Sequence, residues 1–140
     1  MKLLKSLGKN SSFKHEIIIH LNDGSDGTLN FVKSNNYKHT NSDINIGLCS
    51  SINKAAKLVS NKYILYSHDD MYFCPNWDKV LLNEVNTLND DKFYLSGTMI
   101  ERNSGHIPYD FGTDIYNFKE KELLLKYNDL NFYDHQGTHF

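Results

Sequence analysis

The sequence has little of what marks several common protein classes. Only two cysteines, Cys49 and Cys74, occur among 140 residues, and they do not form a Cys-x-x-Cys pair, so we expect two reduced core thiols and no disulfide framework. No apolar run could span a bilayer and no secretory signal precedes the cysteines, which predicts a cytoplasmic protein without a transmembrane segment. The net charge is −2 and no dense Lys/Arg cluster occurs, so nucleic-acid binding is not indicated.

What is present suits one globular domain. Hydrophobic residues make up 39% of the chain and aromatic residues 13%, which argues against global disorder. A chain of 140 residues can build one buried core but not two.

Helical and strand-like patterns alternate along the chain. The segments with helical spacing are 2–8, where Gly8 ends the pattern, 29–35, 52–59, 75–88 and 119–127. The runs typical of strands are 16–21, 37–45, 63–67 and 93–100, and 104–113 reads as a loop. This order predicts an α/β fold in which helices flank a mainly parallel, Rossmann-like sheet.

Two helices carry start signals. Ser50 or Ser51 is expected to cap the helix over 52–59, and Pro75 to open the next one. One apolar face of that next helix is predicted to contain Trp77, Val80, Leu81, Val85 and Leu88.

A polar turn, residues 22–28, follows the first predicted strand. Asp, Asn and Gly suit a calcium loop, but the twelfth position is Lys33 where a bidentate Glu is required. A phosphate loop would need a Gly-Lys-Ser/Thr ending, which is missing. Two interpretations remain: a ligand-binding turn, or a strand-to-helix turn in which Asp26 or Thr28 caps the helix.

A second acidic motif, His68-Asp69-Asp70, follows the predicted strand 63–67. Adjacent carboxylates repel one another unless a counter-charge such as Mg²⁺ is present, and Mg²⁺ takes one or two carboxylates plus phosphate oxygens. Neighbouring strand residues point to opposite faces, so we expect one Asp on the metal and the other on a nucleotide or the backbone. The alternative is a surface turn that caps the helix after Pro75.

A zinc pair is not indicated at the C-terminal end. His135 and His139 have the i, i+4 spacing of metalloproteases, but Gln136 replaces the Glu and Gly137 opposes a helix.

In order and spacing, these pieces resemble the donor half of family-2 glycosyltransferases, which have the GT-A fold. The pieces, within about residues 2–100, are Asn22-Asp23-Gly24-Ser25-Asp26-Gly27-Thr28, Asn45-Ile46-Gly47, Asn53-Lys54-Ala55-Ala56, Tyr63–Asp70 and Pro75-Asn76-Trp77.

The resemblance implies a nucleotide-binding role for the first group of residues. Asp23 would hydrogen-bond uracil, with Asn22 and Gly24 shaping the pocket. Asn53 and Lys54 would lie near the base or the diphosphate.

It also implies a metal site. Asp69 would contact the ribose or diphosphate, and Asp70 would ligate Mg²⁺ or Mn²⁺. Asn22 stands where the family has a first Asp, and His68 where many members carry the first acid of the metal motif.

The family pattern further implies that the chain is partial. Its first strand and its acceptor half are missing, so residues 1–140 would be one partial GT-A domain, with donor-binding residues 1–100 and the start of the acceptor side in 101–140. A partner chain could complete the fold. No motif assigns the catalytic base to Asp110, Asp114 or Asp134.

The leading hypothesis is a metal-dependent, hexosyltransferase-like enzyme that moves a sugar from a UDP-sugar to a carbohydrate or lipid-linked acceptor. The alternatives are a non-catalytic nucleotide-sugar-binding module and another metal-dependent enzyme on a Rossmann-like sheet.

Overall fold

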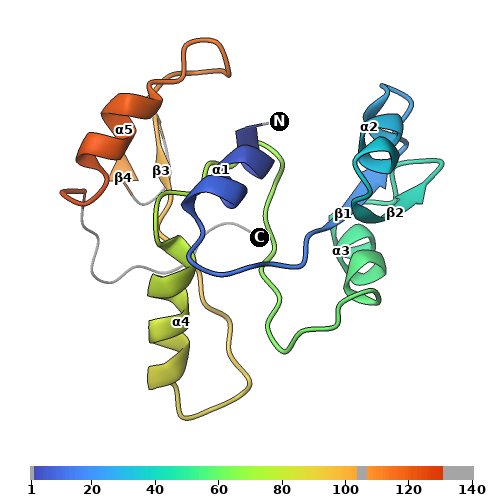
Figure 1. The fold of residues 1–140 in the computed structure, drawn as a ribbon, viewed down its shortest axis with the longest axis horizontal. Helices are drawn as coiled ribbons and strands as arrows, with labels where there is room; N and C mark the ends of the chain where they lie inside the picture. The colour runs from blue at the N-terminus through green and yellow to red at the C-terminus, as the bar shows by residue number, and fades with distance from the viewer. Residues whose placement is uncertain (1, 104–106, 131–140) are drawn as a thin grey trace. The chain divides into compact units, whose positions relative to one another are not determined.

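The structure, a computed structural model, describes residues 2–103 and 107–130 and has an α/β architecture (Figure 1). Its elements are α1 (Lys2–Asn10), β1 (Ile18–Asn22), α2 (Thr28–Ser34), β2 (Lys38–Ser42), α3 (Leu48–Ala56), α4 (Trp77–Thr87), β3 (Ile100–Glu101), β4 (Ile107–Pro108) and α5 (Glu120–Lys126). They divide into two compact units, one formed by residues 14–68 and the other by residues 1–13 and 69–140. No helix in the described part of the chain is long and apolar enough to cross a membrane.

The unit of residues 14–68 is a β-α-β-α segment. β1 and β2 pair in parallel from Ile18 opposite Lys38 to Asn22 opposite Ser42, and α2 connects them. α2 and α3 both pack against β1 and β2. Val32 of α2 is fully buried, and Leu21 of β1 is buried too. Since the strands are parallel, their carboxyl ends meet at one edge of this unit.

Glu16 ties together the segments that enter and leave this unit. Its Oε1 accepts a hydrogen bond from Lys38 Nζ at 2.7 Å, and its Oε2 accepts from Ser60 N at 3.1 Å and Asn61 Nδ2 at 3.1 Å. The hydrogen bonds from Lys38 and then Ser60 lower the pKa of Glu16 from 4.5 to about 2. The carboxylate therefore holds the turn after α3 against the start of the sheet.

We expect Glu16→Gln to lower the melting temperature at neutral pH. Because the folded-state pKa lies below the ordinary value of 4.5, the stabilisation is fully present above pH 4.5 and is lost as the pH falls towards about 2. Melting curves of both proteins between pH 7 and pH 2 should converge at the acid end. Glu84→Gln, on the surface of α4, should show no such convergence, and a difference that stays constant with pH would contradict the role of the Glu16 charge.

In the other unit, the end of α1 is held by the segment before α4. Asn10 Nδ2 donates to the Phe73 carbonyl at 2.6 Å, and the Asn10 carbonyl accepts from Asn76 N at 3.0 Å. Ser6 Oγ accepts a hydrogen bond from Phe73 N at 3.1 Å. α1 ends at Asn10, so the predicted end at Gly8 is wrong. A glycine inside a helix costs about 1 kcal/mol, and these hydrogen bonds outweigh that cost.

Asp78, in the first turn of α4, anchors the residues that follow α1. Its side chain is only 5% exposed. Its two carboxylate oxygens accept from Ser12 N at 2.9 and 2.8 Å, and one also accepts from Phe13 N at 2.8 Å. Lys79 N donates to Oδ1 at 2.9 Å. A buried carboxylate is thus stabilised by main-chain donors from one distant segment and from the residue that follows it.

Two predicted strands are wrong. Residues 63–67 form no strand and belong to no ladder in the described chain, and Tyr63, Ile64, Leu65 and Tyr66 are 41–59% exposed. Of residues 93–100, only Ile100 lies in a strand. An apolar run indicates an extended, hydrophobic segment, but a strand also needs a hydrogen-bonding neighbour, which the run itself does not specify.

Several predicted boundaries also shift. α4 begins at Trp77 rather than Pro75, after Asn76 adopts a left-handed conformation. Its predicted apolar face is only partly covered, since Val80 and Leu88 are exposed. The predicted loop 104–113 contains β4, which pairs in parallel with β3.

Candidate functional site

Asn22, the last residue of β1, links three elements at the carboxyl edge of the sheet. Its Oδ1 accepts hydrogen bonds from Ser42 Oγ at 3.3 Å, Ile46 N at 3.1 Å and Ser51 Oγ at 3.2 Å. These donors come from the end of β2, the loop before α3 and α3 itself. The side-chain oxygen of Asn22 is therefore committed to the protein.

Asp23 and Gly24 make the sharp turn that follows. Asp23 has φ +74° and donates its N–H to the Ser42 carbonyl at 2.9 Å, which extends the parallel ladder by one bond. Its exposed carboxylate accepts one hydrogen bond, from Ser25 Oγ at 2.9 Å, and keeps acceptor capacity towards solvent. Gly24 has φ +71°, and a Cβ there would lie 3.2 Å from the Cβ of Leu29, so a side chain would be both strained and crowded.

The helix-start interpretation of this turn is correct in part. Asp26 Oδ1 accepts from Thr28 N at 2.9 Å, and hydrogen bonding to Thr28 lowers the pKa of Asp26. The N-cap position of α2 is Gly27, which has no side chain to contribute. Asp26 thus serves the helix, whereas Asp23 remains available for a ligand.

α3 carries the next two candidates and begins close to Asn22. It starts after Gly47, whose φ is +78°, with no side-chain cap, so the prediction that Ser50 or Ser51 caps it is wrong. Ser51 Oγ instead bonds the Gly47 carbonyl at 2.6 Å. Asn53 is exposed on α3, and Lys54 Nζ donates to the Asn41 carbonyl of β2. Lys54 therefore braces the helix on the sheet rather than projecting freely.

Asp69 and Asp70 lie in a turn after residues 63–68, which belong to no helix or strand. Both are exposed, and neither carboxylate has a hydrogen bond or ion pair within the described chain. Asp69 begins the unit that contains α4, while Asn22, Asp23, Gly24 and the candidates on α3 belong to the other unit. Within that other unit, the hydrogen bonds from Ile46 N and Ser51 Oγ to Asn22 hold the start of α3 next to the turn at Asp23.

The two carboxylates suit a divalent cation bound together with phosphate. Within residues 2–103 and 107–130, no group of three or more His, Cys, Asp or Glu side chains could hold a metal by itself. Mg²⁺, however, keeps several waters and takes one or two carboxylates plus phosphate oxygens, so it needs fewer protein ligands. Two exposed, unpartnered carboxylates therefore fit a metal that arrives with a diphosphate.

The other candidates play structural roles or lie elsewhere. Cys49 and Cys74 are both free, but Cys49 is exposed rather than buried in the core. Burial raises the pKa of the Cys74 thiol to about 11, so it is a poor nucleophile. His135 and His139, considered for zinc, lie outside the described residues.

The acids considered as a catalytic base are also engaged. Asp110 pairs with Arg102 at 3.5 Å and accepts from Gly112 N at 2.9 Å. Asp114 accepts from Tyr116 N at 2.7 Å and from Asn117 N at 3.2 Å. Asp134 lies outside the described residues, so no base is assigned.

We expect Asn22→Ala to destabilise the fold more than Asn22→Asp does. The Ala variant removes an exposed oxygen that serves three donors and should lower the free energy of unfolding by about 1 kcal/mol. The Asp variant keeps an acceptor in place and should be destabilised less. Urea unfolding of both variants checks this expectation, and equal stability of the Ala variant and the wild type would contradict it.

Comparison with known proteins shows the family of the chain. The sequence profile described as "Glycosyl transferase family 2" matches residues 2–139, beyond the 2–100 segment on which the resemblance was based. No curated protein and no solved structure matches the chain at a significant level. Since the profile spans nearly the whole sequence, including both acid-bearing turns, the resemblance is confirmed, and the chain belongs to glycosyl transferase family 2.

Proposed function

We propose that this chain binds a nucleotide-diphosphate sugar, with UDP as the nucleotide, and transfers the sugar to a carbohydrate or lipid-linked acceptor. The observation that carries the proposal is the position of Asp23. Its exposed carboxylate stands at the carboxyl ends of two parallel strands, next to the start of α3. In open α/β sheets this edge is where ligands bind.

The nucleotide part of the site follows from donor and acceptor chemistry. Asp23 offers a carboxylate acceptor for the N3–H of uracil, and the left-handed turn at Gly24 keeps side-chain atoms away from the base. Asn22 shapes the pocket through its internal bonds. Asn53, exposed on α3, is free to reach the base or the diphosphate.

The diphosphate part would involve Asp69 and Asp70. Asp70 is the proposed ligand of Mg²⁺ or Mn²⁺, and Asp69 is the proposed partner of the ribose or diphosphate. Such a cation, when bound, offsets the negative charge that develops on the diphosphate as the glycosidic bond breaks. The protein's own contribution would be the two carboxylates, one for the cation and one for the ribose or diphosphate.

The domain assignment belongs to the same proposal. We place the donor-binding part of a GT-A domain in residues 1–100 and acceptor-side residues in 101–140. Because Asp110 and Asp114 both make structural hydrogen bonds, a non-catalytic nucleotide-sugar-binding module is the second candidate.

Calorimetry tests the proposal. UDP should bind the full chain in the presence of Mn²⁺ and bind much more weakly in EDTA, whereas CDP should bind more weakly than UDP under both conditions. If UDP with Mn²⁺ gives no heat at millimolar concentrations, the donor site is refuted. Binding of a UDP-sugar without product formation on simple acceptors would identify the second candidate.

A further inference from the structure

The loop of residues 112–117, which precedes α5 at the top of Figure 1, is closed by its own side chains. Asn117 Oδ1 accepts from Thr113 N at 2.8 Å and Asp114 N at 3.1 Å. Asp114 Oδ1 accepts from Tyr116 N at 2.7 Å, and hydrogen bonds from Tyr116 and Asn117 lower the pKa of Asp114. At Gly112, φ is +110° and a Cβ would lie 2.5 Å from the Asn117 carbonyl oxygen. The loop therefore has one tightly defined conformation.

The tip of this loop is apolar and faces solvent. Tyr116 is 97% exposed and Ile115 is 54% exposed. The polar side chains beside them bond to each other: Asn117 Nδ2 donates to Thr113 Oγ1 at 3.0 Å and to Asp114 Oδ2 at 2.8 Å. Few side-chain groups are left to bond the hydroxyls of a sugar, so the tip suits an apolar partner.

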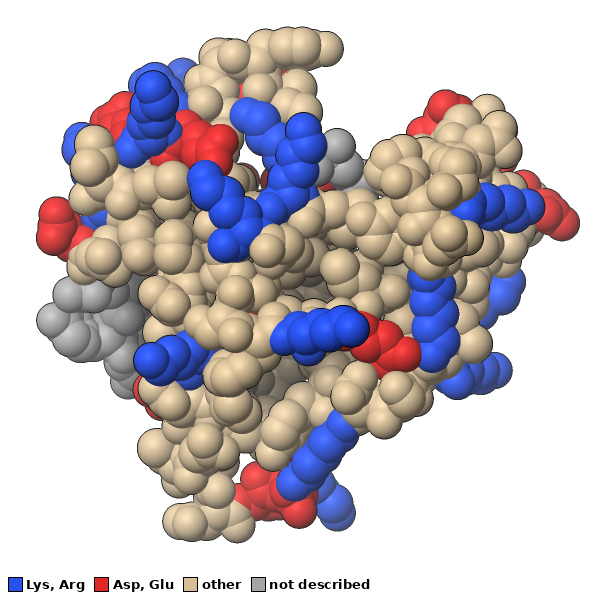
Figure 2. All heavy atoms as spheres, in the orientation of Figure 1, with Lys and Arg blue, Asp and Glu red and all other residues tan. Residues whose placement is uncertain are grey.

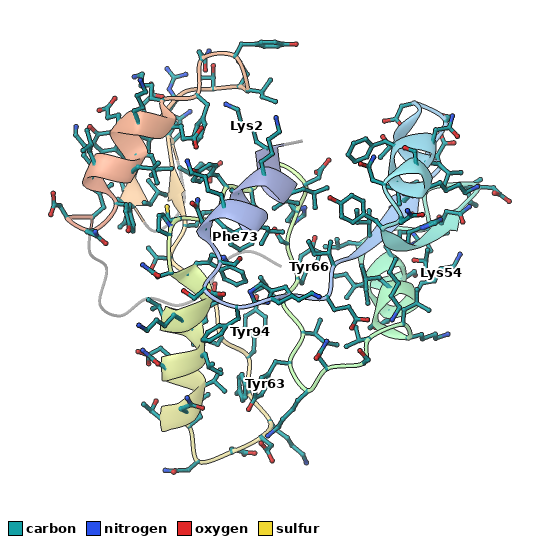
Figure 3. The ribbon with its side chains drawn as sticks, viewed as in Figure 1. Lys2, Lys54, Tyr63, Tyr66, Phe73 and Tyr94 are labelled. Carbon is teal, nitrogen blue, oxygen red and sulfur yellow. The ribbon has the colours of Figure 1, made fainter. Side chains whose placement is uncertain are left out.

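Lysines lie on the segments beside this loop. Lys2 Nζ lies 4.4 Å from the ring centroid of Phe118, the residue that follows the loop, and Lys5 lies one turn further along α1. Lys119 is exposed at the base of the loop. Figure 2 shows lysine or arginine side chains over α1 below this loop, and Figure 3 shows Lys2 on the side of α1 that faces it.

The nearest acid on α5 is already neutralised in part. Glu120 Oε1 accepts from Tyr72 OH at 2.9 Å and pairs with Lys9 at 3.8 Å. Neither Lys2 nor Lys5 has a carboxylate partner in the described part of the chain. Lys2 and Lys5 are therefore available to an anionic partner, whereas the carboxylate within the loop, that of Asp114, is held by Tyr116 N and Asn117 Nδ2.

We propose that this surface docks onto an anionic lipid bilayer. Ile115 and Tyr116 enter the interface between headgroups and acyl chains, where tyrosine is favoured, and Lys2, Lys5 and Lys119 contact the acidic headgroups. Docking of this kind is peripheral and needs no spanning segment. It does not depend on the proposed nucleotide site, because Ile115, Tyr116 and the three lysines take no part in that site.

Vesicle co-sedimentation of the full chain tests this surface. Vesicles of phosphatidylglycerol and phosphatidylcholine should bind the protein, and pure phosphatidylcholine vesicles should bind it far more weakly. The double variant Ile115→Ser/Tyr116→Ser should lower the partition coefficient by at least about tenfold. Lys2→Gln/Lys5→Gln should lower it about fivefold per charge removed, and added salt should weaken binding of the wild type.

Leu125→Ser is the matched control, because Leu125 is 80% exposed on α5. It should leave the partition coefficient unchanged, and circular dichroism of each variant checks that the fold is retained. The proposal is overturned if acidic vesicles bind no protein, if neutral vesicles bind it equally well, or if folded tip and lysine variants bind like the wild type. Self-association through the tip without vesicle binding would instead identify a protein interface and overturn it too. Failure of UDP binding would leave these results unchanged.

Discussion

Asp70→Asn is expected to lower the affinity of the chain for UDP in the presence of Mn²⁺ by at least about 100-fold, a loss of about 2.7 kcal/mol. Asp70 is exposed and has no partner in the described chain, so its carboxylate contributes little to folding that the substitution could disturb. The amide keeps the size of the side chain but removes the charge that a divalent cation requires. Calorimetric titrations with Mn²⁺ and with EDTA measure the effect directly.

The expected pattern is a selective loss of the metal-dependent part of binding. In EDTA, the variant and the wild type should bind UDP equally weakly. Asp129→Asn, which changes another exposed acid, should leave both titrations unaltered. If the Asp70 variant retains wild-type affinity with Mn²⁺, Asp70 is not the ligand, whatever the outcome for UDP binding itself.

Asp78→Ala should be the most destabilising substitution considered, lowering the free energy of unfolding by about 3 kcal/mol and the melting temperature by roughly 10 °C. The side chain is 5% exposed, and its removal leaves the N–H groups of Ser12, Phe13 and Lys79 without their acceptor. Asp78→Asn keeps one oxygen and should lose less.

Urea denaturation of the two variants and the wild type measures these differences. Glu84→Ala, on an exposed position of the same helix, controls for the change in helix composition. A loss below about 1 kcal/mol for Asp78→Ala would show that water replaces the carboxylate as acceptor.

The sequence predicts the β-α-β-α segment well, for a local reason. Strand-like and amphipathic helical patterns alternate within residues 16–59, although the second strand is polar, and each piece contacts its sequence neighbours. β1, α2, β2 and α3 all occur near their predicted positions. The parallel pairing of β1 with β2 was predictable because α2, the helix between them, permits a crossover connection.

Residues 63–67 fail for the opposite reason. Tyr63-Ile64-Leu65-Tyr66 has the composition of a buried strand, yet the described sheet that contains β1 ends after two strands. Whether such a run becomes a strand depends on the hydrogen-bonding edge offered to it, which is a tertiary property.

At the site, residue type was predictable but side-chain direction was not. The turn at Asp23 and the acids Asp69 and Asp70 were singled out from composition and position. That the oxygen of Asn22 bonds Ile46, and that Lys54 bonds a β2 carbonyl, depends on how strands and helix meet. Asp78 was missed because nothing in its local pattern distinguishes it from a surface acid near a helix start.

The contacts of Asp78 also set the order in which parts of the chain can fold during synthesis. Ser12 and Asp78 lie 66 residues apart in the chain, and the intervening residues build the separate β-α-β-α unit. At about 5–20 residues per second, α1 must wait roughly 3–13 s after its own translation before its anchoring acid is made. During that interval the N–H groups of Ser12 and Phe13 lack the carboxylate that accepts their hydrogen bonds in the folded protein, so the end of α1 stays unanchored until Asp78 is made.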